Sequence, residues 1–441
     1  MKIGARQIAT SSIVLLLENL IRLTAVAAIS FWIARHLGPS QFGILNFASA
    51  LVAIFLSVAT MGFDTPVILR LTHTEKPGEV LGTVLFIRTL SGIFLMLLAV
   101  GLIFGLKHNE STTLWVSVIV SLSIFVSAPT IFDYWFKAKT SAFLPATART
   151  LGTLLAVAAK VICIVMGLGV VALAWTITLE ALLTSIGLIG VYLYATKRLT
   201  LNQLSVNLNL AKQIVSESWP YMLSAVAVVA YMKIDVVMLG YLSTNTETGV
   251  YSLAQKLSEV LYMVPIVLID SAYPALAKRF LDSEQNDSKH GQMLFDLAVG
   301  GSLIATVVSV LLARPVIEFV FGESYQSSIQ IFYLHAWSCV AIALNSVRHR
   351  WLATIGLQRF APIVTAFGLV INVALNLALI PSHGAIGATI ATVVSYFISG
   401  YLISYLWFPL REIGHMQTRS LWPWFRLFKA VNLLSKKKIF V

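Results

Sequence analysis

Charged residues are scarce in this sequence. Of its 441 residues only 11% are Asp, Glu, Lys or Arg, whereas 58% are hydrophobic. Soluble domains contain roughly a quarter of charged residues. The shortage of charge therefore excludes an ordinary soluble protein and predicts an integral membrane protein.

Cysteine is nearly absent. The two cysteines, Cys163 and Cys339, lie within long apolar segments, where a thiol behaves as a small apolar group. Their positions predict neither a disulfide framework nor a zinc site. We therefore expect no metal centre and no bound cofactor.

Long hydrophilic loops are also missing. The longest on the predicted inner side, 197–212 and 279–291, are short, and those on the outer side are shorter still. A membrane polymerase or ligase would need an acceptor site, commonly on a large outer loop. The eight histidines are scattered, and no group of nucleophile and base accompanies them. We expect a transporter rather than an enzyme.

Apolar segments long enough to cross a membrane recur along the whole chain. A helix of about 20 apolar residues spans the ~30 Å hydrocarbon core of a bilayer. Twelve such segments are predicted, at 9–34, 41–66, 80–106, 112–136, 143–167, 170–195, 213–241, 248–275, 292–321, 325–347, 360–381 and 384–408. A cleaved signal peptide is the alternative for the first, but that segment is too long and contains Glu18 and Arg22. The pattern predicts an all-α, multi-pass membrane protein.

The net charge of +12 is unevenly distributed. If both termini are cytoplasmic, the outer loops hold little beyond Arg35 and Lys107. The inner loops then hold most basic residues, among them Arg70, Lys76, Lys137, Arg348 and Arg350. Because basic loops stay on the cytoplasmic side, this bias predicts the orientation. The basic excess requires no nucleic-acid partner.

The tail, 409–441, combines basic and aromatic residues. It contains LWPWFRLFK and, further on, three consecutive lysines at 436–438. This composition is typical of a cytoplasmic segment that lies on the anionic lipids of the inner leaflet. A disordered basic end has the same composition, so both interpretations stay open.

The two halves of the sequence share turn patterns. LGPSQFG, with Gly38, follows the first apolar segment, and LGYLSTNTETG, with Gly240, follows the seventh. GLGVVALAWTIT and SHGAIGATIATV open the sixth and the twelfth. Glycine tolerates the backbone geometry that ends a helix. The matched positions favour a duplicated architecture with an N-terminal lobe at 1–200 and a C-terminal lobe at 201–408.

Four segments carry a family resemblance. They are LGPSQFG, IDVVMLG followed by TGVYSLAQKL, PVIEFVFGESY, and LVINVALNLALIPSHGAIGATIAT. Together they resemble the Wzx-type polysaccharide repeat-unit flippases of the multidrug/oligosaccharidyl-lipid/polysaccharide (MOP) exporter superfamily, over nearly the whole chain. The related peptidoglycan-precursor flippases have two additional helices, so the predicted count of twelve disfavours that group.

The resemblance implies a MATE-like fold, with two six-helix lobes around a central cavity that opens alternately to each side of the bacterial cytoplasmic (inner) membrane. It implies as cargo an undecaprenyl-diphosphate-linked oligosaccharide repeat unit for O-antigen of lipopolysaccharide, capsule or exopolysaccharide. A proton or sodium gradient would drive the movement from the inner to the outer leaflet. The implied partners are membrane lipids and the polymerase and chain-length regulator of the same pathway.

Seven cationic residues lie within the predicted spans. Ionisable residues at membrane depth are costly and usually face a partner or an aqueous cavity. Guanidinium and ammonium groups in a dry cavity would bind a diphosphate strongly, whereas snorkelling or a salt bridge within one lobe is the alternative. The predicted substrate-binding residues are Arg22, Arg88, Arg149, Lys160, Lys233, Lys256 and Arg314.

Helical spacing brings some opposite charges together within these spans. Glu18 lies four residues before Arg22, Asp133 four before Lys137, and Lys256 three before Glu259. Simple neutralisation accounts for these pairs.

Five acidic residues are predicted to serve in ion coupling or gating: Glu18, Asp64, Glu180, Asp235 and Asp270. Asp64 is expected to bridge to Arg70 or to a neighbouring helix. Glu180 has no opposite charge within one turn, so it needs a partner on another helix, a cavity or a proton. We therefore prefer Glu180 for coupling.

Three asparagines in the second half, Asn345, Asn372 and Asn376, are candidates for contacting glycan hydroxyls or for joining helices. Asn372 and Asn376 share one helix face, and helix contact is the favoured role.

An exporter of organic cations on the same fold is the alternative function. Such cargo would favour acids in an otherwise apolar cavity, whereas Arg22, Arg88 and Lys160 would repel it. The charges therefore favour a flippase over a cation-coupled multidrug exporter.

Overall fold

The computed structural model describes the backbone of residues 5–107, 110–196, 204–281 and 289–422, with side chains for residue 26 and from residue 28 onward within these ranges. Every regular element in the described ranges is a helix. Ten helical segments there are long and apolar enough to cross a membrane. The predicted all-α, multi-pass architecture is confirmed, and the orientation in the membrane stays a prediction.

Two of the ten segments contain a glycine that interrupts the helix. Gly38 in α1 (Ala5–Ala59) has φ 68° and ψ 171°, and Gly384 in α14 (Ala361–Phe397) has φ 53° and ψ −131°. A positive φ is readily adopted by glycine because it has no Cβ. α1 has 55 residues, and the membrane segment that contains Gly384 has 49, so each is long enough for two crossings. Counting each as two helices, the ten segments supply the twelve spans expected from the sequence.

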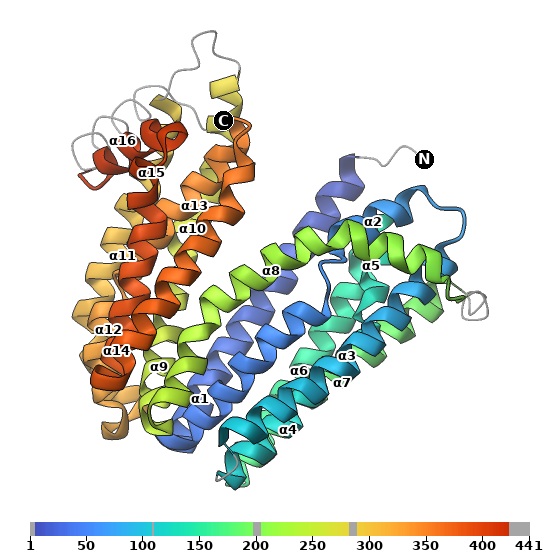
Figure 1. Cartoon of the computed structure of the whole chain (residues 1–441), viewed down its shortest axis with the longest axis horizontal. Helices are drawn as coiled ribbons and strands as arrows, with labels where there is room; N and C mark the ends of the chain where they lie inside the picture. Colours follow the sequence, from blue (N-terminus) through green and yellow to red (C-terminus); the bar gives the residue numbers. More distant parts are fainter. Residues whose placement is uncertain (1–4, 108–109, 197–203, 282–288, 423–441) are drawn as a thin grey trace. The chain divides into compact units, whose positions relative to one another are not determined.

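The chain divides into two compact units, Met1–Tyr241 and Leu242–Val441. In Figure 1 the first runs from blue to green and the second from green to red. α8 (Leu208–Leu242), which would open the C-terminal lobe in the repeat-based division, belongs by its contacts almost entirely to the first unit. The reason is that its beginning is bound to α2 and α3, as described below. The lobe boundary at residue 200 stays a prediction.

The first unit is built from α1 and seven further α-helices. Their bounds are α2 (Asp64–His73), α3 (Pro77–Lys107), α4 (Ser111–Val126), α5 (Phe132–Ala138), α6 (Phe143–Val165), α7 (Val170–Ala195) and α8, with the 3-10 turn η1 (Ala128–Ile131) before α5. α7 packs against both α4 and α6, and α1 packs against α3, α4 and α6 (Figure 1). A buried cluster that includes Phe63, Leu81, Phe132, Tyr192 and Ile214 joins α2, α3, α5, α7 and α8. This cluster fixes the end of the unit at which the pocket described below lies.

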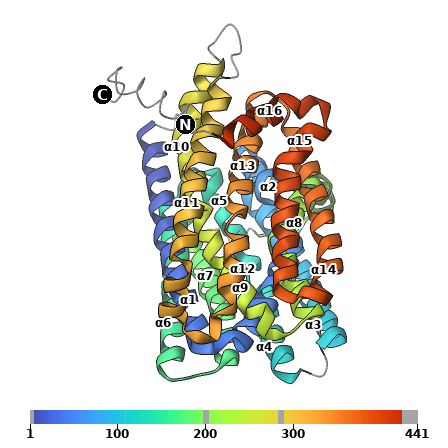
Figure 2. The same cartoon turned by 90° about the vertical axis from the view of Figure 1, so that its left-hand side faces the viewer.

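The second unit begins with α9 and ends with a short amphipathic helix. Its α-helices are α9 (Asn245–Leu261), α10 (Met263–Leu281), α11 (Lys289–Phe321), α12 (Ser327–His335), α13 (Ser338–Thr354), α14, α15 (Ile403–Leu406) and α16 (Arg411–Ser420). Short turns are η3 (Glu323–Tyr325), η4 (Gln358–Phe360), the π-helical η5 (Ile398–Leu402) and η6 (Phe408–Leu410). Figure 2 shows α16 beside α15 at one end of the unit.

The start of the predicted tail is an ordered helix. α16 buries Ile413 and Met416 in a core cluster with Leu294, Phe295 and Trp351. The residues of LWPWFRLFK after Trp422 lie outside the described residues. The first part of the tail thus packs on the second unit, and the interfacial or disordered character of the remainder stays a prediction.

The glycines of the two pairs of matched motifs can be compared by their backbone angles and by their packing. In the second pair of motifs Gly167 and Gly384 have a positive φ, of 68° and 53°, but the position that matches Gly384 is Gly169, whose φ is −79°. In the first pair only Gly38 has a positive φ, because Gly240 lies inside α8. A Cβ on Gly240 would lie 2.3 Å from Cδ2 of Phe47, so this glycine permits close packing rather than a turn. In both pairs of motifs the glycines at matching positions therefore differ in backbone conformation, and the likeness is one of sequence.

Arg348 is buried, which contradicts its assignment to an inner loop. It lies within α13 and is 2% exposed. Its Nη1 donates to the carbonyl of Ser399 at 2.6 Å and to that of Gly400 at 3.3 Å. These carbonyls lie in η5, and a π-helical turn departs from the usual α-helical hydrogen bonding. Hydropathy placed Arg348 outside the helix because a charged residue normally needs water, whereas here backbone carbonyls accept the hydrogen bonds of its guanidinium.

Candidate functional site

Lys160 and Glu180 form an ion pair between neighbouring helices of the first unit. Nζ of Lys160, on α6, lies 2.9 Å from Oε2 of Glu180, on α7, and the two side chains are 9% and 28% exposed. The hydroxyl of Thr153 donates to the other carboxylate oxygen of Glu180 at 3.1 Å. Of the three possibilities expected for Glu180 from the sequence, the structure thus shows a partner on another helix. The pair neutralises two residues that the sequence assigned to different roles.

Arg88 is buried in the same unit. It lies on α3 and is 4% exposed. Its Nη1 donates to the hydroxyl of Thr130, in η1, at 3.1 Å. A guanidinium in this setting keeps its charge, so Arg88 places a positive charge in the interior between α3 and η1.

A chain of alternating charges joins α2, α5 and α6. Nη1 of Arg149 lies 2.6 Å from Oδ1 of Asp133, and Nζ of Lys137 lies 3.1 Å from Oδ2 of the same carboxylate. Lys137 also lies 3.8 Å from Asp64. The predicted pair of Asp133 with Lys137 is confirmed, and Asp64 bridges to a neighbouring helix rather than to Arg70. This network fastens α2 to α5.

Two candidate charges of the second unit, Arg314 and Asp270, are paired nearer its surface. Nε of Arg314 lies 3.0 Å from Oε1 of Glu318, one turn further along α11, and both side chains are exposed. Arg350 forms a salt bridge with Asp270, which joins α13 to α10. Pairs of this exposure typically contribute less than about 1 kcal/mol.

The remaining charged candidates divide into two groups. Lys233, Asp235 and Lys256 each take part in a polar or electrostatic interaction, and Asp235 is fully buried. The side chains of Glu18 and Arg22 lie outside the described residues. The roles predicted for all five stay predictions.

The three asparagines take part in hydrogen bonds of the protein interior. Asn372 and Asn376 are fully buried, and Nδ2 of Asn376 donates to Oδ1 of Asn372 at 3.1 Å. Nδ2 of Asn372 donates to the hydroxyl of Ser395 at 3.4 Å, and Oδ1 of Asn345 accepts from Arg348. Only the contact between Asn372 and Ser395 joins two helical segments, which lie on either side of Gly384, and the other two contacts lie within one helix. Asn372 and Asn376 have no exposed surface for a sugar.

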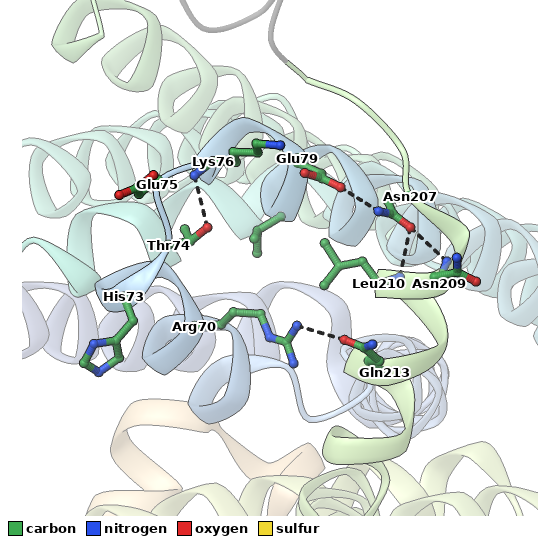
Figure 3. Close-up of a pocket in the computed structure, with 11 residues that line it drawn as sticks. Arg70, His73, Thr74, Glu75, Lys76, Glu79, Asn207, Asn209, Leu210 and Gln213 are labelled. Atoms are coloured by element: carbon green, nitrogen blue, oxygen red, sulfur yellow. Dashed lines mark hydrogen bonds between the residues drawn. The ribbon is translucent and has the colours of Figure 1, made fainter.

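A polar pocket lies between the α2–α3 turn and the start of α8. Figure 3 shows it with Arg70 and His73 from α2, Glu79 from α3 and Gln213 from α8 around its rim. Its volume is about 490 Å³, within the range of roughly 300–1,000 Å³ usual for ligand pockets. Its lining residues are Arg70, His73, Thr74, Glu75, Lys76, Glu79, Val80, Asn207, Asn209, Leu210 and Gln213.

Asn207 fixes one wall of this pocket. Its Oδ1 accepts from the backbone N–H groups of Asn209 and Leu210 at 3.0 and 3.1 Å, the geometry of a helix N-cap. Its Nδ2 donates to Oε1 of Glu79 at 2.6 Å, and its backbone N–H donates to the hydroxyl of Thr83 at 3.0 Å. One residue therefore starts α8 and ties it to α3.

Arg70 fixes the opposite wall. Its Nη2 lies 2.7 Å from Oε1 of Glu217 and its Nη1 3.4 Å from Oε1 of Gln213, both on α8 (Figure 3 shows the second contact). The turn before α2 also approaches α8, because a Cβ on Gly62 would lie 2.3 Å from the backbone nitrogen of Met222. α8 is therefore held against α2 at two places.

A second pocket, of about 440 Å³, adjoins the first. It is lined by Thr65, Pro66, Leu69, Arg70, His73, Glu217 and Tyr221, so it is richer in apolar groups. Arg70 and His73 line both pockets.

Sequence reasoning missed both pockets. Arg70 and Lys76 were counted only as indicators of orientation, and Asn207 fell in a loop. The one usable signal was Asn207 itself, because asparagine is a preferred N-cap and accepts from the N–H groups two and three residues further on. Nothing local indicated that the α2–α3 turn would face it. In the described part of the chain, no group of three or more His, Cys, Asp or Glu is arranged to hold a metal ion.

Comparisons with known proteins agree with this architecture. A family model described as "Polysaccharide biosynthesis protein" matches residues 8–280, and the MatE model matches residues 220–378.

Two relatives from Haloferax volcanii are similar over most of their length. The chain is 21% identical over 410 residues to the probable low-salt glycan biosynthesis flippase Agl15, covering 88% of this chain and 82% of the relative. It is 23% identical over 391 residues to the probable flippase AglR, covering 85% and 78%. These names fit the expectation of a transporter rather than an enzyme.

Solved structures share the fold. The lipid II flippase MurJ, in an inward closed conformation, aligns with a TM-score of 0.73 at 14% identity, covering 96% of this chain and 93% of that one. An inward-facing multidrug resistance transporter of the MATE family aligns with a TM-score of 0.61 at 16% identity, covering 90% and 99%. At these identities the likeness establishes the MATE-like fold and does not bear on cargo.

Proposed function

Because the chain belongs to the family of polysaccharide biosynthesis proteins, within the MOP exporter superfamily, we propose that it is a flippase that moves a lipid-linked glycan across the membrane. The observation that carries the proposal is the similarity to two relatives named as probable flippases, which extends over 88% and 85% of the chain. The absence of any large hydrophilic domain in the sequence agrees with transport rather than catalysis.

Buried cations in the first unit supply chemistry that suits a diphosphate-linked cargo. Arg88 and Lys160 keep positive charge away from water, each held by a single helix-to-helix contact that the structure describes. A diphosphate can compete for these groups, because charge-assisted hydrogen bonds to phosphate are strong where water is excluded. Lys160 would exchange Glu180 for a phosphate oxygen as the cargo enters.

The finer assignment follows the family resemblance. The proposed cargo is an undecaprenyl-diphosphate-linked repeat unit, moved from the inner to the outer leaflet of a bacterial cytoplasmic membrane. The product would serve O-antigen, capsule or exopolysaccharide synthesis, in which a polymerase acts next. Arg22, Arg149, Lys233, Lys256 and Arg314 remain proposed contacts of the charged headgroup.

Coupling to a proton or sodium gradient is proposed to drive alternating access. Glu180 is the acid we prefer, because protonation or cation binding at its carboxylate would release Lys160. Asp64, Asp235 and Asp270 remain further proposals, and so does Glu18. The release of Lys160 at the moment the cargo binds would link ion binding to cargo binding.

Export of organic cations is the second candidate, favoured by the match of the MatE model to residues 220–378. The buried Arg88 disfavours it, since a cationic drug would meet a fixed positive charge in the first unit.

Complementation tests the proposal. Expression of this chain in a flippase-deficient strain of a matching polysaccharide pathway should restore surface polysaccharide, and Arg22→Ala should abolish the restoration at normal protein level. Arg22→Lys should restore part of it, because charge is kept while the planar fork is lost. Resistance to ethidium without polysaccharide would instead favour drug export.

A further inference from the structure

The two adjoining pockets of the first unit place polar and apolar lining residues in the same order as the parts of an amphipathic ligand. The polar pocket of Figure 3 lies on one side, the pocket containing Pro66, Leu69 and Tyr221 on the other, and Arg70 and His73 at their border. A lipid-linked glycan has the same order of chemical parts: sugars, diphosphate, hydrocarbon. A ligand of this kind therefore matches both pockets at once.

The polar pocket is balanced in charge. Arg70 and Lys76 oppose Glu75 and Glu79 in its lining, and the remaining polar groups are mostly neutral amides and a hydroxyl. A balanced pocket offers a free anion little net attraction. It suits a ligand rich in hydroxyl groups, since each hydroxyl both donates and accepts and the lining supplies both kinds of partner. The sugars of a glycan fit this description.

The residues at the border of the two pockets supply hydrogen-bond donors for an anion. The guanidinium of Arg70 has five N–H donors, so it can hold Glu217 and a phosphate oxygen together. Its planar fork suits phosphate geometry, and His73, which is exposed beside it, offers a further ring nitrogen. A diphosphate between sugars and hydrocarbon would lie at this border.

The walls of the polar pocket are set before a ligand arrives. Asn207 is held by the N-cap and by Glu79, and Arg70 by α8, so their orientations require no ordering on binding. Preorganisation of this kind raises affinity because less conformational entropy is lost. The exposed Trp219 and Tyr221 on α8 suit a position at the membrane interface, where such side chains are enriched.

From these observations we infer that the corner formed by α2, the α2–α3 turn and the start of α8 is a docking site for the lipid-linked glycan. The glycan occupies the polar pocket, the diphosphate meets Arg70 and His73, and the adjoining part of the hydrocarbon chain occupies the apolar pocket. This inference rests on the proposed function and adds the place where the sugars are recognised. It also replaces the buried Asn372 and Asn376 as sugar contacts.

The test fills the polar pocket at the cost of the 3.4 Å contact between Arg70 and Gln213, while the 2.7 Å contact of Arg70 with Glu217 is kept. Gln213 is exposed on α8 and lines the pocket, so Gln213→Trp places an indole in the space. Ser216→Trp is the matched control, because Ser216 is exposed on the same helix and is outside the lining of either pocket. The probe is the free oligosaccharide released by mild acid from the lipid-linked pool of the strain that encodes the chain. Its binding to the full-length protein in detergent is followed by saturation-transfer-difference NMR.

The wild type and Ser216→Trp should bind the released oligosaccharide alike, whereas Gln213→Trp should raise its dissociation constant about tenfold, equivalent to about 1.4 kcal/mol. A second probe, undecaprenyl diphosphate without sugar, should bind Gln213→Trp normally and Arg70→Gln more weakly. Equal binding of the oligosaccharide by wild type and Gln213→Trp overturns the inference, and so does a lack of binding by the wild type.

Retention of a phospholipid by the wild type and its loss from Gln213→Trp in native mass spectrometry would assign the pocket to a structural lipid, which also overturns the inference. Failure of the proposed function is a separate result: the wild type would bind the oligosaccharide at the pocket and yet fail to restore surface polysaccharide in the deletion strain.

Discussion

Replacing Lys160 by Met should destabilise the first unit markedly. The substitution removes an ammonium group 2.9 Å from Glu180 and leaves that carboxylate, 28% exposed, with Thr153 as the hydrogen-bonding partner the structure describes. Removal of one partner of a buried ion pair typically costs about 3–5 kcal/mol. Because Glu180 keeps the hydrogen bond from Thr153, we expect the lower end, about 3 kcal/mol.

The double substitution Lys160→Met/Glu180→Met should recover most of that loss. An apolar pair of similar volume removes the desolvation cost of both charges, and such replacements are often neutral or stabilising. The interaction between the two sites, measured by a double-mutant cycle, should therefore be large.

Thermal unfolding of the purified full-length protein in one detergent measures the effect. For a unit of this size, 3 kcal/mol corresponds to a fall in Tm of about 6–12 °C. Lys212→Met is the control, because Lys212 is exposed on α8 and its removal should leave Tm nearly unchanged. A Tm of Lys160→Met equal to that of Lys212→Met would refute the reasoning.

The same variants separate structure from transport. If the pair only holds α6 to α7, the stable double variant should restore surface polysaccharide as well as the wild type. If Glu180 couples transport to an ion, the double variant should be stable and inactive. The second outcome is the one our proposal predicts.

Three further substitutions test the structure at other points. Asn207→Ala should cost about 1 kcal/mol for the lost N-cap and speed hydrogen exchange at the start of α8, where unchanged exchange would contradict the assigned cap. Gly62→Ala should lower Tm strongly, because φ is 64° and the new Cβ would lie 2.3 Å from backbone, whereas Gly105→Ala, with nothing within 4 Å, should not. Asn372→Ala should cost about 1–3 kcal/mol by removing the acceptor of the Asn376 amide, and an unchanged Tm would argue against a buried network.

The spans were predictable because each depends on local composition. Twelve apolar stretches predict twelve helices, and the structure contains them, two pairs being continuous through Gly38 and Gly384. The hairpins follow from the same pattern, because the chain must turn back after each crossing to enter the membrane again. The second pair of glycine motifs indicated a turn in each half, although the positive φ falls at different motif positions, Gly167 and Gly384.

The contacts between helices were less predictable. The pair of Asp133 with Lys137 follows from helical spacing, whereas the pair of Lys160 with Glu180 depends on the rotation of α6 against α7. Sequence showed that Glu180 needed a partner but not which one. Arg348 was misplaced for the same reason, since its partners are backbone carbonyls 51 and 52 residues away.

The pockets were the least accessible to sequence reasoning. They are formed where α2, α3 and α8 meet, and Asn207 and Glu79, which build one wall, are 128 residues apart. Their residue types are ordinary in loops of a membrane protein. Only the three-dimensional arrangement distinguishes Arg70 at the border of two pockets from a basic residue that merely marks the inner face.

Reconstitution in liposomes is the measurement that tests the central claim most directly. The purified full-length chain would be incorporated with the lipid-linked oligosaccharide extracted from the strain that encodes it, and glycan in the accessible leaflet would be followed over time with a membrane-impermeant lectin or glycosidase. Under an imposed proton or sodium gradient, the chain should move the glycan between leaflets faster than empty liposomes and faster than liposomes with the Lys160→Met/Glu180→Met protein. Movement at the rate of empty liposomes, with correctly folded protein and either gradient, would contradict the account.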